Sequence, residues 1–174
     1  ILVDDFAAKV GTGADKARLA YVLPNFQNPT GRTMTEARRA ALVAKAAELN
    51  IPLIEDNPYG DLWFGEAPPA PLTARNPDGC IYMGSFSKVL APGLRIGFIV
   101  APKAIYPKLL QAKQAADLHT PGFNQRVVAE VIRDGFLDRH VPTIRALYKQ
   151  QRDTMLDALE REMAGLDVTW TRPA

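Results

Sequence analysis

Four short apolar runs, each bounded by polar, glycine or proline residues, predict strands in the first hundred residues. They are "LAYVL" (Leu19–Leu23), "IPLIE" (Ile51–Glu55), "CIYMG" (Cys80–Gly84) and "IGFIVA" (Ile96–Ala101). Apolar runs of this length between turn signals are typical of buried strands. A further strand is expected to begin at "DVTWT" (Asp167–Thr171).

The segment between the first two runs has a helical pattern. Thr33 and Glu36 have the spacing of a capping box, which predicts the start of a helix. Leu42, Ala46 and Leu49 then follow on one helical face, and Asn50 is expected to end the helix.

From about Lys103 onward the pattern is helical. We expect one helix to about Leu118, a second over about Phe123–Arg133 and a long one over roughly Val141–Met163. Strands that alternate with helices indicate an α/β fold with a mostly parallel sheet.

Composition excludes several classes of protein. The 174 residues are 47% hydrophobic and 23% charged, with a net charge of +2 and scattered basic residues, so we expect no nucleic-acid binding through this segment and no membrane surface. No apolar run approaches the roughly 20 residues that span a bilayer. A single cysteine, Cys80, suits a reducing compartment, and we expect a cytoplasmic protein. Because the chain opens on "ILVDDF" without a methionine, we also expect an internal fragment.

Polar residues follow three of the predicted strands. Asn28 comes after the first, Asp56 after the second, and Ser85–Lys88 after the third. Taken singly, each has an ordinary explanation as a turn former, a helix cap or a solvated side chain. Ligands of α/β proteins bind beyond the carboxyl ends of the strands, so this shared placement predicts that the residues converge.

Together these residues match the chemistry of pyridoxal phosphate, and no metal site is indicated. Lys88 offers an amine for the cofactor aldehyde, and it is the candidate catalytic residue. Asp56 offers a carboxylate that would keep the pyridine nitrogen protonated. The remaining candidates are hydrogen-bond donors and a cation: Asn28 and Tyr59 for the phenolic oxygen, and Ser85, Ser87 and Arg95 for the phosphate.

The motifs "NFQNPTG", "EDNPY" and "GSFSKVLAPGLRIGF", in this order, resemble the fold-type I aminotransferases of class I/II. Within that family, "FQNPTG", "SFSKVLAPGLR" and "KQAADLHTPGFNQ" are similar to the branch of 2-aminoadipate aminotransferases, kynurenine aminotransferases and the aminotransferase-like domains of MocR-type regulators.

The resemblance implies a three-layer α/β/α large domain, truncated here at both ends. Residues 1–140 would be part of the cofactor-binding domain, and residues 141–174 would lead into a small C-terminal domain through the long helix. It also implies a homodimer, an upstream segment that adds phosphate contacts and an aromatic ring stacked on the pyridine, and a downstream arginine that binds the substrate carboxylate.

The activity implied is transfer of an amino group from an α-amino acid of 2-aminoadipate, aromatic or branched-chain type to a 2-oxo acid such as 2-oxoglutarate. Two alternatives stay open within the family: the effector domain of a MocR-type regulator of the GntR family, and a pyridoxal-phosphate-dependent lyase. A doubly wound domain that binds another phosphate compound is disfavoured, because the chain has no glycine-rich dinucleotide or P-loop fingerprint.

Overall fold

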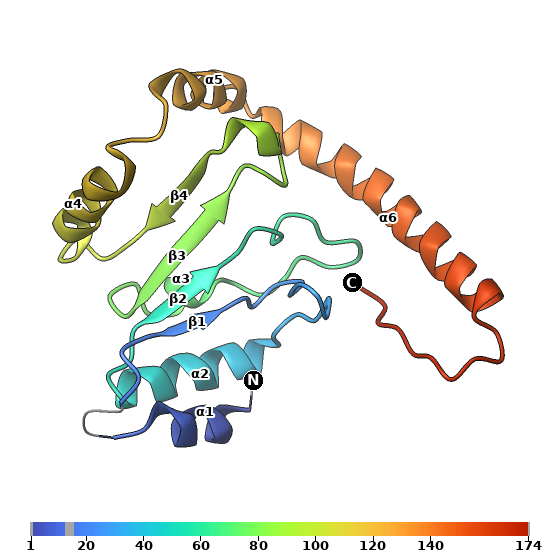
Figure 1. Cartoon of the computed structure of the whole chain (residues 1–174), viewed down its shortest axis with the longest axis horizontal. Coiled ribbons are helices and arrows are strands. Elements are labelled where there is room, and N and C mark those ends of the chain that lie inside the picture. The colour runs from blue at the N-terminus through green and yellow to red at the C-terminus, as the bar shows by residue number, and fades with distance from the viewer. Residues whose placement is uncertain (1, 13–15, 174) are drawn as a thin grey trace.

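The computed structural model describes residues 2–12 and 16–173, which fold around one four-stranded sheet (Figure 1). The strands are β1 (Ala20–Val22), β2 (Leu53–Asp56), β3 (Cys80–Ser85) and β4 (Gly97–Val100), in the order β1-β2-β3-β4. β1, β2 and β3 are parallel, and β4 is antiparallel to β3. The four strands predicted in the first hundred residues and the mostly parallel sheet are therefore confirmed.

Six helices are present in the described ranges. They are α1 (Val3–Val10), α2 (Glu36–Glu48), α3 (Leu72–Arg75), α4 (Tyr106–Asp117), α5 (Gly122–Ile132) and α6 (Phe136–Glu162). In Figure 1, α1 and α2 lie along one side of the sheet, α4 and α5 lie beyond β4, and α6 extends away from the strands. The chain then returns from the end of α6 toward the loop after β1 (Figure 1).

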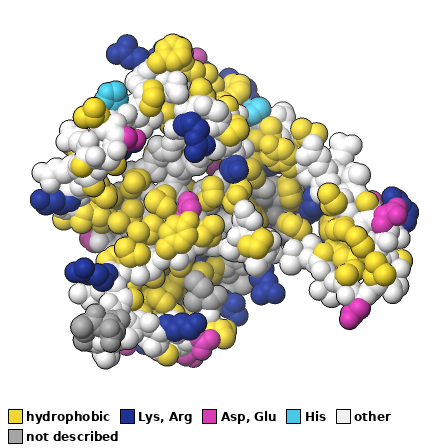
Figure 2. Space-filling model, viewed as in Figure 1, with side chains coloured by type: hydrophobic (Ala, Val, Ile, Leu, Met, Phe, Trp, Pro, Cys, Tyr) yellow, Lys and Arg dark blue, Asp and Glu magenta, His cyan; other side chains and the backbone are white. Residues whose placement is uncertain are grey.

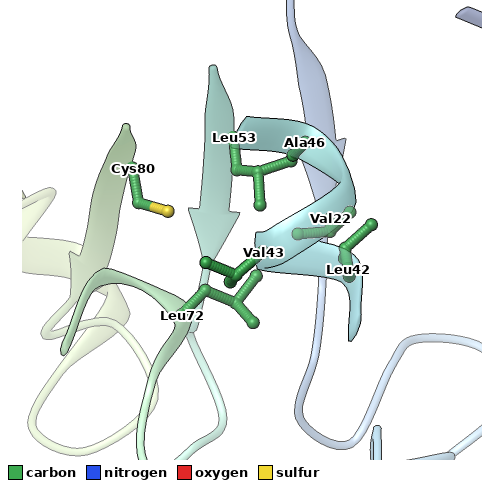
Figure 3. Close-up of a cluster of buried hydrophobic side chains, with 7 residues drawn as sticks. All are labelled: Val22, Leu42, Val43, Ala46, Leu53, Leu72 and Cys80. Atoms are coloured by element: carbon green, nitrogen blue, oxygen red, sulfur yellow. The ribbon is translucent and has the colours of Figure 1, made fainter. Parts of the chain in front are cut away.

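The hydrophobic core lies between the sheet and helices α2 and α3 (Figure 3). Successive strand residues point to opposite faces, and Val22 of β1, Leu53 of β2 and Cys80 of β3 point into this core. α2 and α3 close it from the other side. Its buried members are Val22, Leu42, Val43, Ala46, Leu53, Leu72 and Cys80.

The opposite face of the sheet is open in the described part of the chain. Tyr21 of β1 and Ile99 of β4 lie on it, and each exposes about half of its surface, 51% and 53%. Figure 2 shows hydrophobic side chains at the surface over the strands. The described residues thus supply the sheet and one of the two helical layers expected for the large domain.

Three details predicted from the sequence differ from the structure: one strand and the starts of two helices. Asp167–Thr171 forms no strand, because no neighbouring strand lies beside it in the described ranges. The prediction that Thr33 and Glu36 form a capping box is wrong. Thr35 is the N-cap of α2, and the Thr33 hydroxyl oxygen instead accepts the Phe26 N–H at 3.2 Å. α6 begins at Phe136 rather than near residue 141, with Pro142 inside it.

The single cysteine is part of the core. Cys80 is a free and buried thiol, and burial raises its pKa to about 11, so it is an unreactive member of the core.

Within residues 2–12 and 16–173, no helix has both the length and the apolar character that crossing a membrane requires.

One carboxylate is fully buried in the core. Glu55 of β2 points to the α2 side of the sheet, and its Oε2 accepts hydrogen bonds from the Thr73 N–H at 3.2 Å and the Thr73 hydroxyl at 3.3 Å. Its Oε1 has no hydrogen-bond partner among the described residues. Burial raises the pKa of Glu55, and the Thr73 hydrogen bonds and the charge of Arg39 oppose this shift.

We expect Glu55→Gln to stabilise the protein at pH 8 and to change little at pH 4. Because the folded-state pKa lies above the ordinary value of 4.5, the wild-type protein loses stability as the pH rises from that value through the folded-state pKa. A neutral amide of the same shape avoids this loss, and each kcal/mol recovered raises the melting temperature by about 2–4 °C.

Melting temperatures of both proteins across this pH range measure the effect. Glu66→Gln, at an exposed position, is the matched control and should follow the wild-type curve. Parallel pH profiles for wild type and Glu55→Gln would contradict the expectation.

Candidate active site

The candidate residues leave the sheet at one edge. Parallel pairing of β1 with β2 and of β2 with β3 places the carboxyl ends of these strands together. The loop after β1 carries Asn28, the turn after β2 carries Tyr59, and the turn after β3 carries Ser87 and Lys88. Residues up to 60 positions apart in the sequence are thereby brought to one place.

A cavity of about 640 Å³ opens at this edge. Four predicted residues line it: Asn28, Tyr59, Ser87 and Lys88. The Lys88 Nζ lies 5.7 Å from the centre of the Tyr59 ring. The remaining wall is largely apolar and consists of Phe26, Gln27, Pro29, Gly31, Leu62, Phe64, Pro92, Tyr148 and Pro173.

Segments distant in sequence complete this wall. Tyr148 comes from α6 and Pro173 from the segment that follows it. Pro173 lies against Gly31, where an added Cβ would approach it to 3.2 Å. The loop after β2 is held to α6 by the Arg145 guanidinium, which stacks 3.8 Å from the centre of the Trp63 ring.

Asp56 and Ser85 lie at the strand ends beside the cavity rather than in its wall. Asp56 is the last residue of β2 and is half-buried, on the face opposite to Glu55. One of its carboxylate oxygens accepts a hydrogen bond from the Tyr21 hydroxyl. This hydrogen bond, with a smaller contribution from burial, raises the pKa of Tyr21 to about 12. The Ser85 hydroxyl oxygen accepts the Ser87 N–H at 3.1 Å.

Arg95 also lies outside the cavity wall, but it contacts Pro92, which is part of that wall. It follows the 3₁₀ turn Pro92–Leu94 with a left-handed backbone, at φ 54°. Its side chain is exposed, and its guanidinium donates to the Pro92 carbonyl at 3.3 Å. Its assignment to a phosphate group stays a prediction.

A chain of hydrogen bonds, buried or part-buried, joins α2, the loops after β1 and β2, and strand β3, and it was not predicted from the sequence. Arg39 of α2 donates to the Asn25 side-chain oxygen. The Asn25 amide donates to Asn57 Oδ1 at 2.8 Å, and the Asn57 amide donates to the Tyr82 hydroxyl at 2.9 Å. Asn25 lies three residues before Asn28 and Asn57 directly follows Asp56, so this chain aligns the two segments that carry them.

The donor set fits pyridoxal phosphate. An amine, a phenol, an amide and a hydroxyl share one cavity whose volume lies within the range of roughly 300–1,000 Å³ of small-molecule sites. Tyr21 donates to Asp56 Oδ2. No hydrogen bond to Oδ1 is found among the described residues, and that oxygen could face a ring nitrogen.

Comparison with known proteins identifies the family. Residues 4–173 match the family described as Aminotransferase class I and II. The chain therefore belongs to this family, which confirms the resemblance seen in its motifs.

Both kinds of relative expected from the motifs are found. The 2-aminoadipate transaminase of Thermus thermophilus is 44% identical over 163 residues, which are 91% of this chain and 41% of the relative. The uncharacterized HTH-type transcriptional regulator YisV of Bacillus subtilis is 38% identical over 178 residues, which are 99% of this chain and 37% of the relative.

A solved structure supports the fold. The kynurenine aminotransferase of Pyrococcus horikoshii, in complex with PMP, is similar with a TM-score of 0.90 at 40% identity, covering 99% of this chain and 43% of that protein. The chain thus spans about two fifths of the length of these relatives. The fold class predicted from the sequence is confirmed.

We expect Asn57→Leu to destabilise the protein by about 1–3 kcal/mol. The substitution keeps the size of the side chain but leaves the buried Asn25 amide without its acceptor. Urea unfolding should show a lower midpoint with an unchanged slope. Tyr82→Phe, which removes only the last hydroxyl of this hydrogen-bond chain, should lower the free energy of unfolding by less. A midpoint equal to the wild-type value in Asn57→Leu would mean that the hydrogen-bond chain does not hold the loops.

Proposed function

We propose that the protein is a pyridoxal-phosphate-dependent aminotransferase that moves an amino group from an α-amino acid to a 2-oxo acid such as 2-oxoglutarate. The observation that supports this most directly is the position of the Lys88 amine. It shares a cavity with Asn28 and Tyr59 at the sheet edge where β2 ends in Asp56. Membership of the aminotransferase family supports the same assignment.

When bound, pyridoxal phosphate supplies an aldehyde that condenses with amines and a ring that withdraws electrons. Lys88 would hold that aldehyde through its amine. As a free amine, Lys88 would remove the proton from the substrate α-carbon as general base and deliver it, as general acid, to the carbon that carried the cofactor aldehyde. The Asp56 carboxylate would keep the ring nitrogen protonated.

The remaining site residues hold the cofactor in place. The Asn28 amide and the Tyr59 hydroxyl donate hydrogen bonds to the phenolic oxygen. Ser85 and Ser87 would supply hydroxyls for the phosphate, and Arg95 would supply the positive charge.

Substrates with long or apolar side chains suit this cavity. Phe26, Leu62 and Phe64 give it apolar walls. The transaminase of Thermus thermophilus is named for 2-aminoadipate, and the Pyrococcus horikoshii enzyme is named for kynurenine. We propose amino acids of 2-aminoadipate, aromatic or branched-chain type.

The assembly and the compartment are part of the same proposal. A homodimer would complete the site, as the family resemblance implies, and the large and small domains would divide near residue 140. The free Cys80 thiol fits a cytoplasmic location.

The effector domain of a MocR-type regulator is the second candidate. The similarity of YisV over 99% of this chain favours it. The encoded sequence ahead of Ile1 discriminates the two: a basic helix-turn-helix domain there would favour the regulator. A lyase of the same fold is distinguished by its products, because only transamination converts the cofactor stoichiometrically to pyridoxamine phosphate.

We expect Lys88→Ala to abolish turnover while the protein still binds pyridoxal phosphate non-covalently, because the amine is removed and the other contacts remain. Borohydride reduction followed by peptide mapping should place the cofactor on the Lys88 peptide in the wild-type protein and on no peptide in the variant. Lys103→Ala, on the chain between β4 and α4, is the matched control. Near wild-type turnover in Lys88→Ala would contradict the assignment of Lys88 as the catalytic residue.

We expect Asp56→Ala to slow exchange of the substrate α-proton by roughly 10²-fold or more, because charge on the ring nitrogen is no longer stabilised. Proton exchange into deuterated water, followed by NMR, measures this step independently of product release. Exchange at the wild-type rate would show that Asp56 does not hold the ring.

A further inference from the structure

Tyr21 contacts the proposed cofactor-binding carboxylate of Asp56 but is not part of the cavity wall. It lies in the middle of β1, where the register pairs Tyr21 with Ile54 and Val22 with Glu55. Val22 and Glu55 are buried on the α2 side of the sheet, so Tyr21 and Asp56 share the opposite face. The Tyr21 hydroxyl crosses to β2 and donates to Asp56 Oδ2.

We propose that Tyr21 is a positioning residue for Asp56, which fixes one carboxylate oxygen and so aims the other at the cofactor ring nitrogen. This inference rests on the proposed function. Tyr21 does not contact the reacting atoms and acts through Asp56 alone.

The geometry explains why the carboxylate needs such a contact. The last torsion of an aspartate side chain is soft, so one fixed oxygen decides where the other points. Tyr21 is the only hydrogen-bond donor to the Asp56 side chain that is found in the described ranges. A ring nitrogen needs a carboxylate oxygen in one defined place, and a rotating carboxylate would offer it there only part of the time.

The chemistry of the pair keeps the direction of this hydrogen bond constant. The Asp56 carboxylate raises the pKa of Tyr21 to about 12, so the phenol remains a donor at neutral and moderately alkaline pH. Tyr21 is 51% exposed and lies outside the core cluster, so its ring contributes little to the packing around α2. Removal of the hydroxyl alone therefore tests the contact with little effect on the fold.

The test is a double-mutant cycle on cofactor affinity in the complete protein. All four proteins carry Lys88→Ala, so that covalent attachment does not contribute, and they differ by Tyr21→Phe and Asp56→Ala alone and combined. Titration with pyridoxal phosphate, followed by its absorbance, gives the dissociation constants. We expect Tyr21→Phe to weaken binding roughly tenfold when Asp56 is present, as suits a hydrogen bond to a charged group, and to have no effect when residue 56 is alanine.

A second readout follows the protonation of the ring. The pH titration of the bound-cofactor spectrum should shift in Tyr21→Phe in the same direction as in Asp56→Ala, and by a smaller amount. Tyr106→Phe, at an exposed tyrosine of α4, should match the parent in both measurements.

Each outcome of the cycle decides a separate point. Equal weakening by Tyr21→Phe in both backgrounds, or loss of the circular dichroism of the folded apoprotein, would show a structural role and overturn the inference. Tighter binding in Tyr21→Phe would show that the phenol competes with the ring for Asp56, which also overturns it. If Asp56→Ala itself leaves the affinity unchanged, the proposed function fails at Asp56, whatever Tyr21 does.

Discussion

The parallel pairing of β1, β2 and β3 is the constraint on which the candidate site depends. It brings the carboxyl ends of the three strands to one edge, where Asn28, Tyr59 and Lys88 follow them. The register matters as much as the direction. A slip of one residue in β2 would turn Asp56 into the core and Glu55 toward the open face, because successive side chains alternate between the faces.

The alternation also explains how two adjacent carboxylates have different surroundings. Glu55 is fully buried behind the sheet, where burial raises its pKa. Asp56, one residue on, is half-buried on the opposite face and accepts the Tyr21 hydroxyl. The boundary between the core and the site therefore runs through the sheet itself. The hydrogen-bond chain from Arg39 to Tyr82 crosses the loops at this edge and couples their positions to α2.

Much of the site could be predicted because its residues stand at strand ends, where local sequence carries strong turn signals. "NPTG" and "DNPY" mark such ends directly, and Asn28 and Tyr59 do line the cavity. Tyr21 was missed because an aromatic residue inside the apolar run "LAYVL" is indistinguishable from a core residue. The strand expected at Asp167–Thr171 was wrong because a strand requires a neighbour, which no local pattern specifies.

The sequence by itself determined the strand order along the chain, the α/β class and the family, because apolar periodicity and turn motifs are local properties. Only the tertiary structure decided which polar groups meet. The hydrogen bond from Tyr21 to Asp56 and the closure of the cavity wall by Tyr148 and Pro173 join segments far apart in sequence. Such contacts follow from strand register and helix packing, which are set by the whole core at once.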